Sequence, residues 1–256
     1  MRRYWVPAQA ISADQVDFSD EVFHHIFDVC RQEVGSKFEV LTGNQQAYLV
    51  EVTQVGKKRA QARRLEVRQL PPLKKPYLVL ALSICRYHVM DAIVEKAVEM
   101  GVTRIQPFFS EQSFIRKANS LPAGKLDRWE KIVKSATQQC GRGDLMLIAK
   151  PIDLAEIRSI FNPDQRQLGL FAYEGASTQG LKDCLKPSLG LEKPEEIWVF
   201  VGSEGGFSQT EVQLFKNWGL ESISLGEQVL RVETACITLL AILKYEFDLM
   251  RSGGTS

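Results

Sequence analysis

The sequence predicts an α/β protein that carries a smaller β-rich domain at its N-terminus. Beyond Pro76, short apolar runs alternate with segments whose apolar residues recur at helical spacing, as strands and helices do in α/β domains. From Phe38 to Arg68, apolar and polar residues alternate instead, which is the pattern of half-buried antiparallel strands. Between the two regions, the prolines of Pro71–Pro76 interrupt any regular element. We therefore predict two domains, residues 1–72 and residues 73–256.

The elements follow from these patterns in chain order. A hairpin is expected over Tyr48–Arg63, turning at Gly56. Apolar runs in the second domain predict strands at Tyr77–Ser83, Arg104–Phe109, Leu168–Tyr173 and Ile197–Val201. Helical spacing predicts helices at Val89–Met100, at Asp127–Gln138, from Ser208 onward and at Thr234–Met250. Gly101 supplies a stop for the first helix, and Ser208 with Glu211 forms a capping box at the start of the third.

The composition is that of an ordinary globular protein. Its 256 residues are 45% hydrophobic, which suffices for packed cores, and the 32 basic residues nearly cancel the 31 acidic ones. The five cysteines contain no Cys-x-x-Cys pair and the histidines fit no zinc spacing, so we predict reduced thiols and no metal. No signal peptide or membrane-spanning run is found, and we expect a soluble, cytoplasmic protein.

Two stretches near the C-terminus, Val201–Ser208 and Leu225–Ala235, are the strongest candidates for a ligand site. Each follows an apolar strand, where open α/β sheets bind their ligands. The first matches neither a dinucleotide fingerprint nor a Walker loop. Glu204 would repel a phosphate, but it can accept hydrogen bonds from ribose hydroxyls or an amine, or face a cation. S-adenosylmethionine offers all three groups; the alternative is a tight turn in which the glycines serve only backbone geometry.

The second stretch sets charged residues just before a predicted helix. A helix N-terminus carries free N–H groups and partial positive charge, so this loop can hold a carboxylate or a polarised carbonyl. The alternative is that Arg231 and Glu233 simply pair with each other.

Together, these two stretches resemble the paired signature of the RsmE-type 16S ribosomal RNA uridine N3-methyltransferases, a branch of the SPOUT superfamily. Further similarity covers nearly the whole chain, at His25 with Gly35, Arg86–Gly101, Arg128-Trp129 and Gln139–Arg142. The resemblance implies an α/β fold in which a PUA-like RNA-binding β-barrel domain (residues 1–72) precedes a SPOUT methyltransferase domain (residues 73–256) with a C-terminal trefoil knot. It also implies a homodimer that binds S-adenosylmethionine and methylates N3 of a uridine in small-subunit ribosomal RNA, on the free RNA or the assembled subunit.

The resemblance also assigns a cofactor site. Carried onto the matching positions, the cofactor-binding residues are Leu170, Phe171, Val201, Gly202, Glu204, Gly205, Gly206, Leu225, Gly226, Val229, Leu230 and Arg231. Ser203 stands where the family usually has proline, and we expect the loop to be freer as a result. Two alternatives stay open: a SPOUT enzyme with another RNA target, and a non-catalytic RNA-binding protein of ribosome assembly.

Methylation at uracil N3 requires removal of a weakly held proton and support for charge on the flanking carbonyl oxygens. Arg142 is the candidate for steadying these oxygens or a nearby phosphate, with a surface ion pair as the alternative. Glu204 and Glu233 are the candidate bases, unless they only hold the loop or the cofactor.

The stretch from Gly56 to Pro76 is strongly basic, with Glu66 as its one acidic residue. On a hairpin these charges can meet RNA phosphates; a solvated hairpin is the alternative. The residues predicted to bind RNA are Arg2, Arg3, Lys57, Lys58, Arg59, Arg63, Arg64 and Arg86. Tyr4 and Trp5 are expected to add stacking surface.

Overall fold

The computed structural model describes residues 2–175, 180–190 and 193–250, which form two compact units. Unit 1 contains the chain up to Pro72 together with Lys134–Leu145, and unit 2 contains Leu73–Val133 and the chain from Met146 onward. One unit boundary falls after Pro72, whereas Lys134–Leu145, which the prediction assigned to the second domain, groups with unit 1. The division into domains 1–72 and 73–256 stays a prediction.

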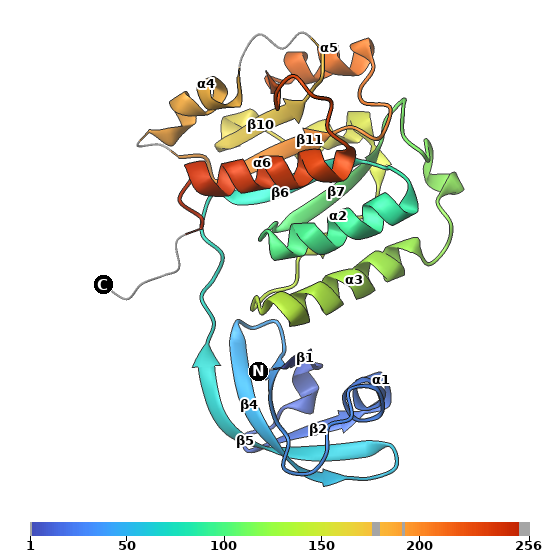
Figure 1. Ribbon diagram of the computed structural model, residues 1–256, viewed down its shortest axis with the longest axis vertical. Coiled ribbons are helices and arrows are strands. Elements are labelled where there is room, and N and C mark those ends of the chain that lie inside the picture. Colours follow the sequence, from blue (N-terminus) through green and yellow to red (C-terminus); the bar gives the residue numbers. More distant parts are fainter. Residues whose placement is uncertain (1, 176–179, 191–192, 251–256) are drawn as a thin grey trace. The chain divides into compact units, whose positions relative to one another are not determined.

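Unit 1 contains a five-stranded sheet in the order β1-β3-β4-β5-β2 (Figure 1). Its strands are β1 (Arg3–Trp5), β2 (Gln15–Ser19), β3 (Lys37–Leu41), β4 (Gln46–Val55) and β5 (Arg59–Gln69). β1 runs parallel to β3, and the other pairs are antiparallel, as predicted for the central hairpin. α1 (Asp20–Phe23) continues as a π-helical turn over His24–Val29. Phe23 of α1 and Phe27 of this turn join Phe18 and Phe38 of the sheet in one apolar core.

A buried carboxylate ties β3 to its neighbours in unit 1. Glu39 is 6% exposed and accepts hydrogen bonds from Arg68 Nε and from Arg3 Nε, each at 2.6 Å. The hydrogen bond from Arg68, aided by Arg3, outweighs burial and lowers the pKa of Glu39 to about 2. Arg3 therefore has a structural partner. Tyr4 and Trp5 are buried, so the prediction that they offer stacking surface to RNA is wrong.

Unit 2 is built on a parallel sheet of seven strands in the order β12-β10-β11-β6-β7-β8, with β9 pairing with β7. The strands are β6 (Tyr77–Ser83), β7 (Arg104–Phe109), β8 (Leu147–Ile148), β9 (Ile152–Asp153), β10 (Gln167–Ala172), β11 (Glu196–Val201) and β12 (Glu221–Ile223). Helices cover both faces, so the central strands are continuous apolar runs. The predicted α/β class is confirmed, whereas the trefoil knot stays a prediction.

The helices are α2 (Tyr87–Glu99), α3 (Lys125–Cys140), α4 (Leu181–Leu185), α5 (Gln209–Asn217) and α6 (Val232–Glu246). Short 3₁₀ helices lie at Ala8–Ala10, Ala118–Ser120, Leu154–Ser159, Pro163–Gln165 and Lys186–Leu189. α2 and α6 pack against each other on one face of the sheet, and α5 covers the other (Figure 1). The predicted capping box is confirmed, because Ser208 and Glu211 each accept a hydrogen bond from the other's backbone N–H. Within the described residues, no helix combines the length and apolar composition needed to cross a membrane.

An aromatic core fixes the strand ends that carry the site. Phe171 of β10, Phe200 of β11 and Phe215 of α5 are fully buried against one another, with ring centroids 5.2 to 5.3 Å apart between Phe215 and the two strand residues. Because the strands are parallel, their carboxyl ends meet at one edge of the sheet. The segments after β6, β10, β11 and β12 are therefore neighbours.

Candidate active site

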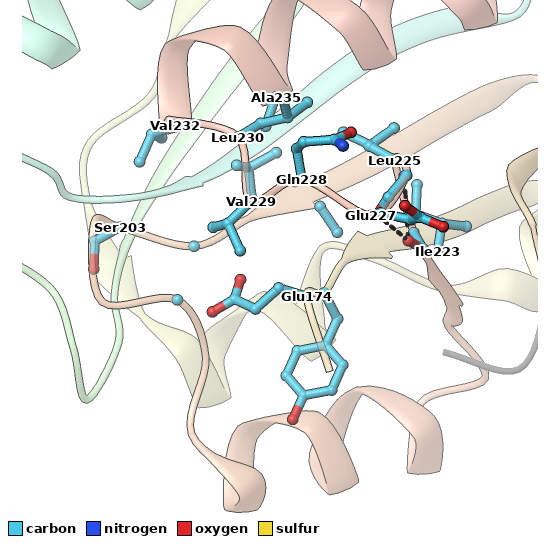
Figure 2. A pocket seen from close by; sticks show the side chains of 17 residues that line it. Glu174, Ser203, Ile223, Leu225, Glu227, Gln228, Val229, Leu230, Val232 and Ala235 are labelled. Atoms are coloured by element: carbon cyan, nitrogen blue, oxygen red, sulfur yellow. Dashed lines mark hydrogen bonds between the residues drawn. The ribbon is translucent and has the colours of Figure 1, made fainter. Parts of the chain in front are cut away.

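A cavity opens at the carboxyl ends of β10, β11 and β12 (Figure 2). It holds about 630 Å³ of space, its open mouth included. Its walls are residues 172–174 at the end of β10, residues 201–203 and 206 at the end of β11, and residues 223–230, 232 and 235 from the end of β12 to the first turn of α6. β10 lies between β12 and β11 in the sheet, so three segments far apart in sequence enclose one space.

Two glycines shape the loop after β11. A Cβ on Gly202 would lie 2.9 Å from the backbone of Gly206, and Gly206 adopts a φ of +68°. The Gly206 N–H donates to the carbonyl of Ser203 at 2.9 Å, which closes a tight turn. This tight turn also forms one side of the cavity, because the backbone of Gly202 and Gly206 lines it.

Ser203 anchors this glycine loop. Its side chain is buried, and its hydroxyl donates to the carbonyl of Gln112, in the loop after β7, at 2.5 Å. The same β7 loop is held at Glu111, whose N–H donates to the Glu211 carboxylate at 2.8 Å. The expectation that serine leaves the loop freer is therefore wrong, because the hydroxyl makes a tertiary bond that proline cannot make.

A second, wider space of about 1000 Å³ adjoins the first. Its ionisable lining comes from the start of α2, the segment after β10, the glycine loop and the start of α6: Arg86, His88, Glu174, Glu204, Arg231 and Glu233. Oε1 of Glu204 accepts from the backbone N–H of Arg86 at 3.0 Å, which joins the glycine loop to the start of α2. Among the described residues no ion pair joins Arg231 to Glu233, so the alternative that they only neutralise each other is not observed.

The structure divides the predicted cofactor residues into three groups. Those that line the first cavity are Val201, Gly202, Gly206, Leu225, Gly226, Val229 and Leu230. Glu204 and Arg231 line only the adjoining space. Leu170 and Phe171 lie fully buried within β10, and Gly205 lies against the side chain of Gln112, so these three support the walls from behind.

Sequence reasoning missed part of the wall after β10. Tyr173 and Glu174 line the cavity, and the Tyr173 hydroxyl accepts from Nε2 of Gln209 at 2.8 Å. On the loop after β12, Ser224 was missed, whereas Glu227 and Gln228 lie within the predicted stretch Leu225–Ala235 but were not singled out as cofactor residues. The rule that ligands bind at strand carboxyl ends applied to the predicted strand Leu168–Tyr173 as well, and it would have singled out Glu174.

Arg142 lies in unit 1, outside both sets of lining residues. Its side chain is 7% exposed, and its Nη2 lies 2.7 Å from Oδ2 of Asp144. The ion-pair alternative is thus observed, and the catalytic role of Arg142 stays a prediction.

The predicted RNA-binding residues are spread over both units. Lys57, Lys58 and Arg59 are exposed at the turn between β4 and β5. The others have internal partners or lie elsewhere: Arg63 pairs with Glu51 at 3.0 Å, Arg64 lies 6.0 Å from the Tyr48 ring, Arg2 donates to the Cys30 carbonyl, and Arg86 belongs to unit 2.

Two cysteines lie buried near the site. Burial, followed by the charge of Glu204, raises the pKa of Cys85, and burial likewise raises the pKa of Cys236. Both remain protonated thiols at neutral pH and are poor nucleophiles. Over residues 2–175, 180–190 and 193–250, no group of histidine, cysteine and acidic side chains has the arrangement of a metal site.

Comparison with known families gives two matches along the chain. An RNA methyltransferase domain matches residues 72–244, and an RNA methyltransferase PUA domain matches residues 18–63. These assignments agree with the parallel sheet of unit 2 and the small sheet of unit 1.

Individual relatives match over most of the chain. Ribosomal RNA small subunit methyltransferase E of Rickettsia conorii is 30% identical over 228 residues, covering 87% of this chain and 86% of that protein. The protein of the same name from Bacillus subtilis is 25% identical over 260 residues, covering 98% and 99%.

Two solved structures are also similar. Ribosomal RNA small subunit methyltransferase E from Neisseria gonorrhoeae, bound to S-adenosyl methionine, superposes with a TM-score of 0.82 at 28% identity, over 96% of this chain and 97% of that one. A methyltransferase from Legionella pneumophila in complex with the same cofactor gives 0.83 at 26% identity, over 95% and 96%. The resemblance found in the sequence is thereby confirmed. The chain belongs to the ribosomal RNA small subunit methyltransferase E family.

Proposed function

We propose that this protein transfers a methyl group from S-adenosylmethionine to N3 of a uridine in 16S ribosomal RNA. The observation that carries the proposal is the pair of adjoining spaces at the carboxyl edge of the parallel sheet, one walled by the glycine loop and the other lined with charge. A methyl transferase needs such a pair, because cofactor and substrate must meet at one point. The names of the relatives support the choice of small-subunit RNA and of the cofactor.

The residues of the first cavity fit this cofactor. Gly202 and Gly206 line the cavity with bare backbone, and a Cβ would lie 2.9 Å from the Gly206 backbone at Gly202 and 2.9 Å from the Glu174 carboxylate at Gly206. Ile223, Leu225 and Val229 offer apolar surface to a purine, as nucleoside sites commonly do. Glu227 supplies carboxylate oxygens, which accept hydrogen bonds from ribose hydroxyls or an amine.

The second space is where the uridine would enter. S-adenosylmethionine, when bound, supplies a methyl group on a positively charged sulfur. Glu204 and Glu233 are the carboxylates that line only this second space, and one of them accepts the N3 proton as N3 takes the methyl group. In this proposal Arg142, which lines neither space in the single chain, would steady the uracil oxygens or a nearby phosphate through the fixed donor geometry of its guanidinium.

RNA docking involves unit 1 in this proposal. Lys57, Lys58 and Arg59 protrude at the end of the β4–β5 hairpin, and exposed cations of this kind neutralise phosphates. The protein acts as a homodimer, as the family resemblance implies.

The experiment is methyl transfer with separated ribosomal subunits from a strain that lacks this protein. Subunits are incubated with the purified protein and methyl-labelled S-adenosylmethionine, and we expect label in the 16S RNA of the small subunit only. Label in the large subunit or in transfer RNA would instead support a different RNA target. Cofactor binding without any transfer would support the non-catalytic assembly protein.

A further inference from the structure

The two spaces of the site share one wall. The residues that line both are Glu174, Ser203, Gly206, Val229, Leu230 and Val232. Glu174 is the only ionisable side chain among them, and the Ser203 hydroxyl is already donated to Gln112. The other acidic residues lie to either side, since Glu227 lines only the first cavity and Glu204 and Glu233 line only the second.

The Glu174 carboxylate is free to meet a ligand. Its residue is exposed, and no hydrogen bond or ion pair with any other described residue engages it. Figure 2 shows the side chain extending from the end of β10 into the cavity, toward Val229. Its Oε1 lies 2.9 Å from the point that a Cβ on Gly206 would occupy. The absence of a side chain at Gly206 therefore leaves room for this carboxylate at the shared wall.

A side chain at the shared wall faces the part of the cofactor whose charge changes during methyl transfer. In methyl transfer the sulfur, the methyl group and the attacking nitrogen are aligned, so the sulfur must lie where the cofactor space meets the substrate space. The sulfur is positively charged before transfer and neutral afterwards. A carboxylate held at that point stabilises the charged cofactor and loses its attraction once the methyl group has left.

We propose that Glu174 faces the sulfonium of S-adenosylmethionine and makes the site prefer the charged cofactor to its neutral product, S-adenosylhomocysteine. This inference rests on the proposed function. Glu174 is then a cofactor-binding residue that favours product release.

Calorimetric titration with the two ligands isolates this role, because both carry the same adenosine, amine and carboxylate and differ only at the sulfur. At low salt, we expect Glu174→Gln to weaken S-adenosylmethionine binding about fivefold, as a partly screened ion pair of this kind would. Binding of S-adenosylhomocysteine should stay within about twofold of wild type, because a neutral sulfur has no Coulombic attraction to lose.

Glu227→Gln is the matched control, since it removes the same charge from the first cavity away from the shared wall. It should leave the ratio of the two dissociation constants unchanged. Because Glu174 has no partner among the described residues, the variant should also keep the wild-type unfolding midpoint. In the wild type alone, rising salt should reduce the preference for S-adenosylmethionine.

The outcomes separate the inference from the function on which it rests. If Glu174→Gln weakens both ligands equally, or neither, the inference is overturned, and equal weakening would indicate contact with the ribose or the amine. A wild-type protein that binds neither ligand would instead overturn the proposed function.

Discussion

Ser203 shows how a single hydroxyl can place a ligand loop. Its acceptor, the Gln112 carbonyl, belongs to a loop that is itself fixed by buried serines. The hydroxyls of Ser83, Ser110 and Ser113 lie 2.6 to 3.0 Å from one another, and Ser113 also accepts from the Ser110 N–H. A satisfied buried network of this kind rigidifies the backbone around it. The position of the glycine loop is thus set, through Ser203 and Gln112, by a buried hydrogen-bond network of unit 2.

Removing that hydroxyl should loosen the cofactor cavity. In Ser203→Ala the Gln112 carbonyl loses its donor, which costs about 1–3 kcal/mol in folding free energy at such a site. We expect a lower unfolding midpoint and weaker S-adenosylmethionine binding, measured by calorimetry. Ser159→Ala is the control, because Ser159 also donates to a backbone carbonyl but is exposed and lines neither space. Unchanged cofactor affinity in Ser203→Ala would show that the anchor is irrelevant to the site.

Among the elements, the β4–β5 hairpin carries the residues that we propose contact RNA, and its strands hold those residues in place. β4 and β5 are long and well paired, and β5 is bound on its other side by β2. A hairpin held along its length presents its turn as a fixed feature, so the cations at that turn do not have to be ordered when RNA binds.

Charge reversal at this turn tests the docking role. In the triple variant Lys57→Glu, Lys58→Glu and Arg59→Glu, we expect weaker binding to the small subunit. The slope of log affinity against log salt should fall by about 2 to 3, because each lost phosphate contact contributes roughly 0.7–0.9. Filter binding across a salt series measures both quantities.

The control reverses three exposed lysines of unit 2, Lys182, Lys186 and Lys216, with the same change in net charge. In this control, log affinity for the small subunit should depend more steeply on log salt than it does in the hairpin variant. Equal slopes in the two triple variants would mean that the hairpin has no special part in docking.

For the whole molecule, the sequence predicted the elements whose pattern is long and uniform. β6 and β7 lie where they were predicted, because strands of a parallel sheet buried on both faces are continuous apolar runs. β12 has three residues and β8 has two, too few to show any period. The parallel pairing of β1 with β3 joins segments far apart in the chain, so no local sequence pattern predicts it.

The site was predictable to the extent that it is built from contiguous motifs. The loops at Gly202 and Gly226 were found because each motif sets glycine close to charged residues. Glu174 was missed because no glycine motif accompanies it, although it directly follows the predicted strand Leu168–Tyr173. The anchor between Ser203 and Gln112 spans 91 residues, so only the folded chain reveals it.

The central claim, methylation of a uridine at N3, is tested most directly by the identity of the product nucleoside. Small subunits from a strain lacking the protein are reacted with the protein and S-adenosylmethionine, and the 16S RNA is digested to nucleosides for chromatography and mass spectrometry. The account predicts N3-methyluridine that is absent from subunits incubated without the protein. A methyl group found only on another base or on a ribose hydroxyl would contradict it.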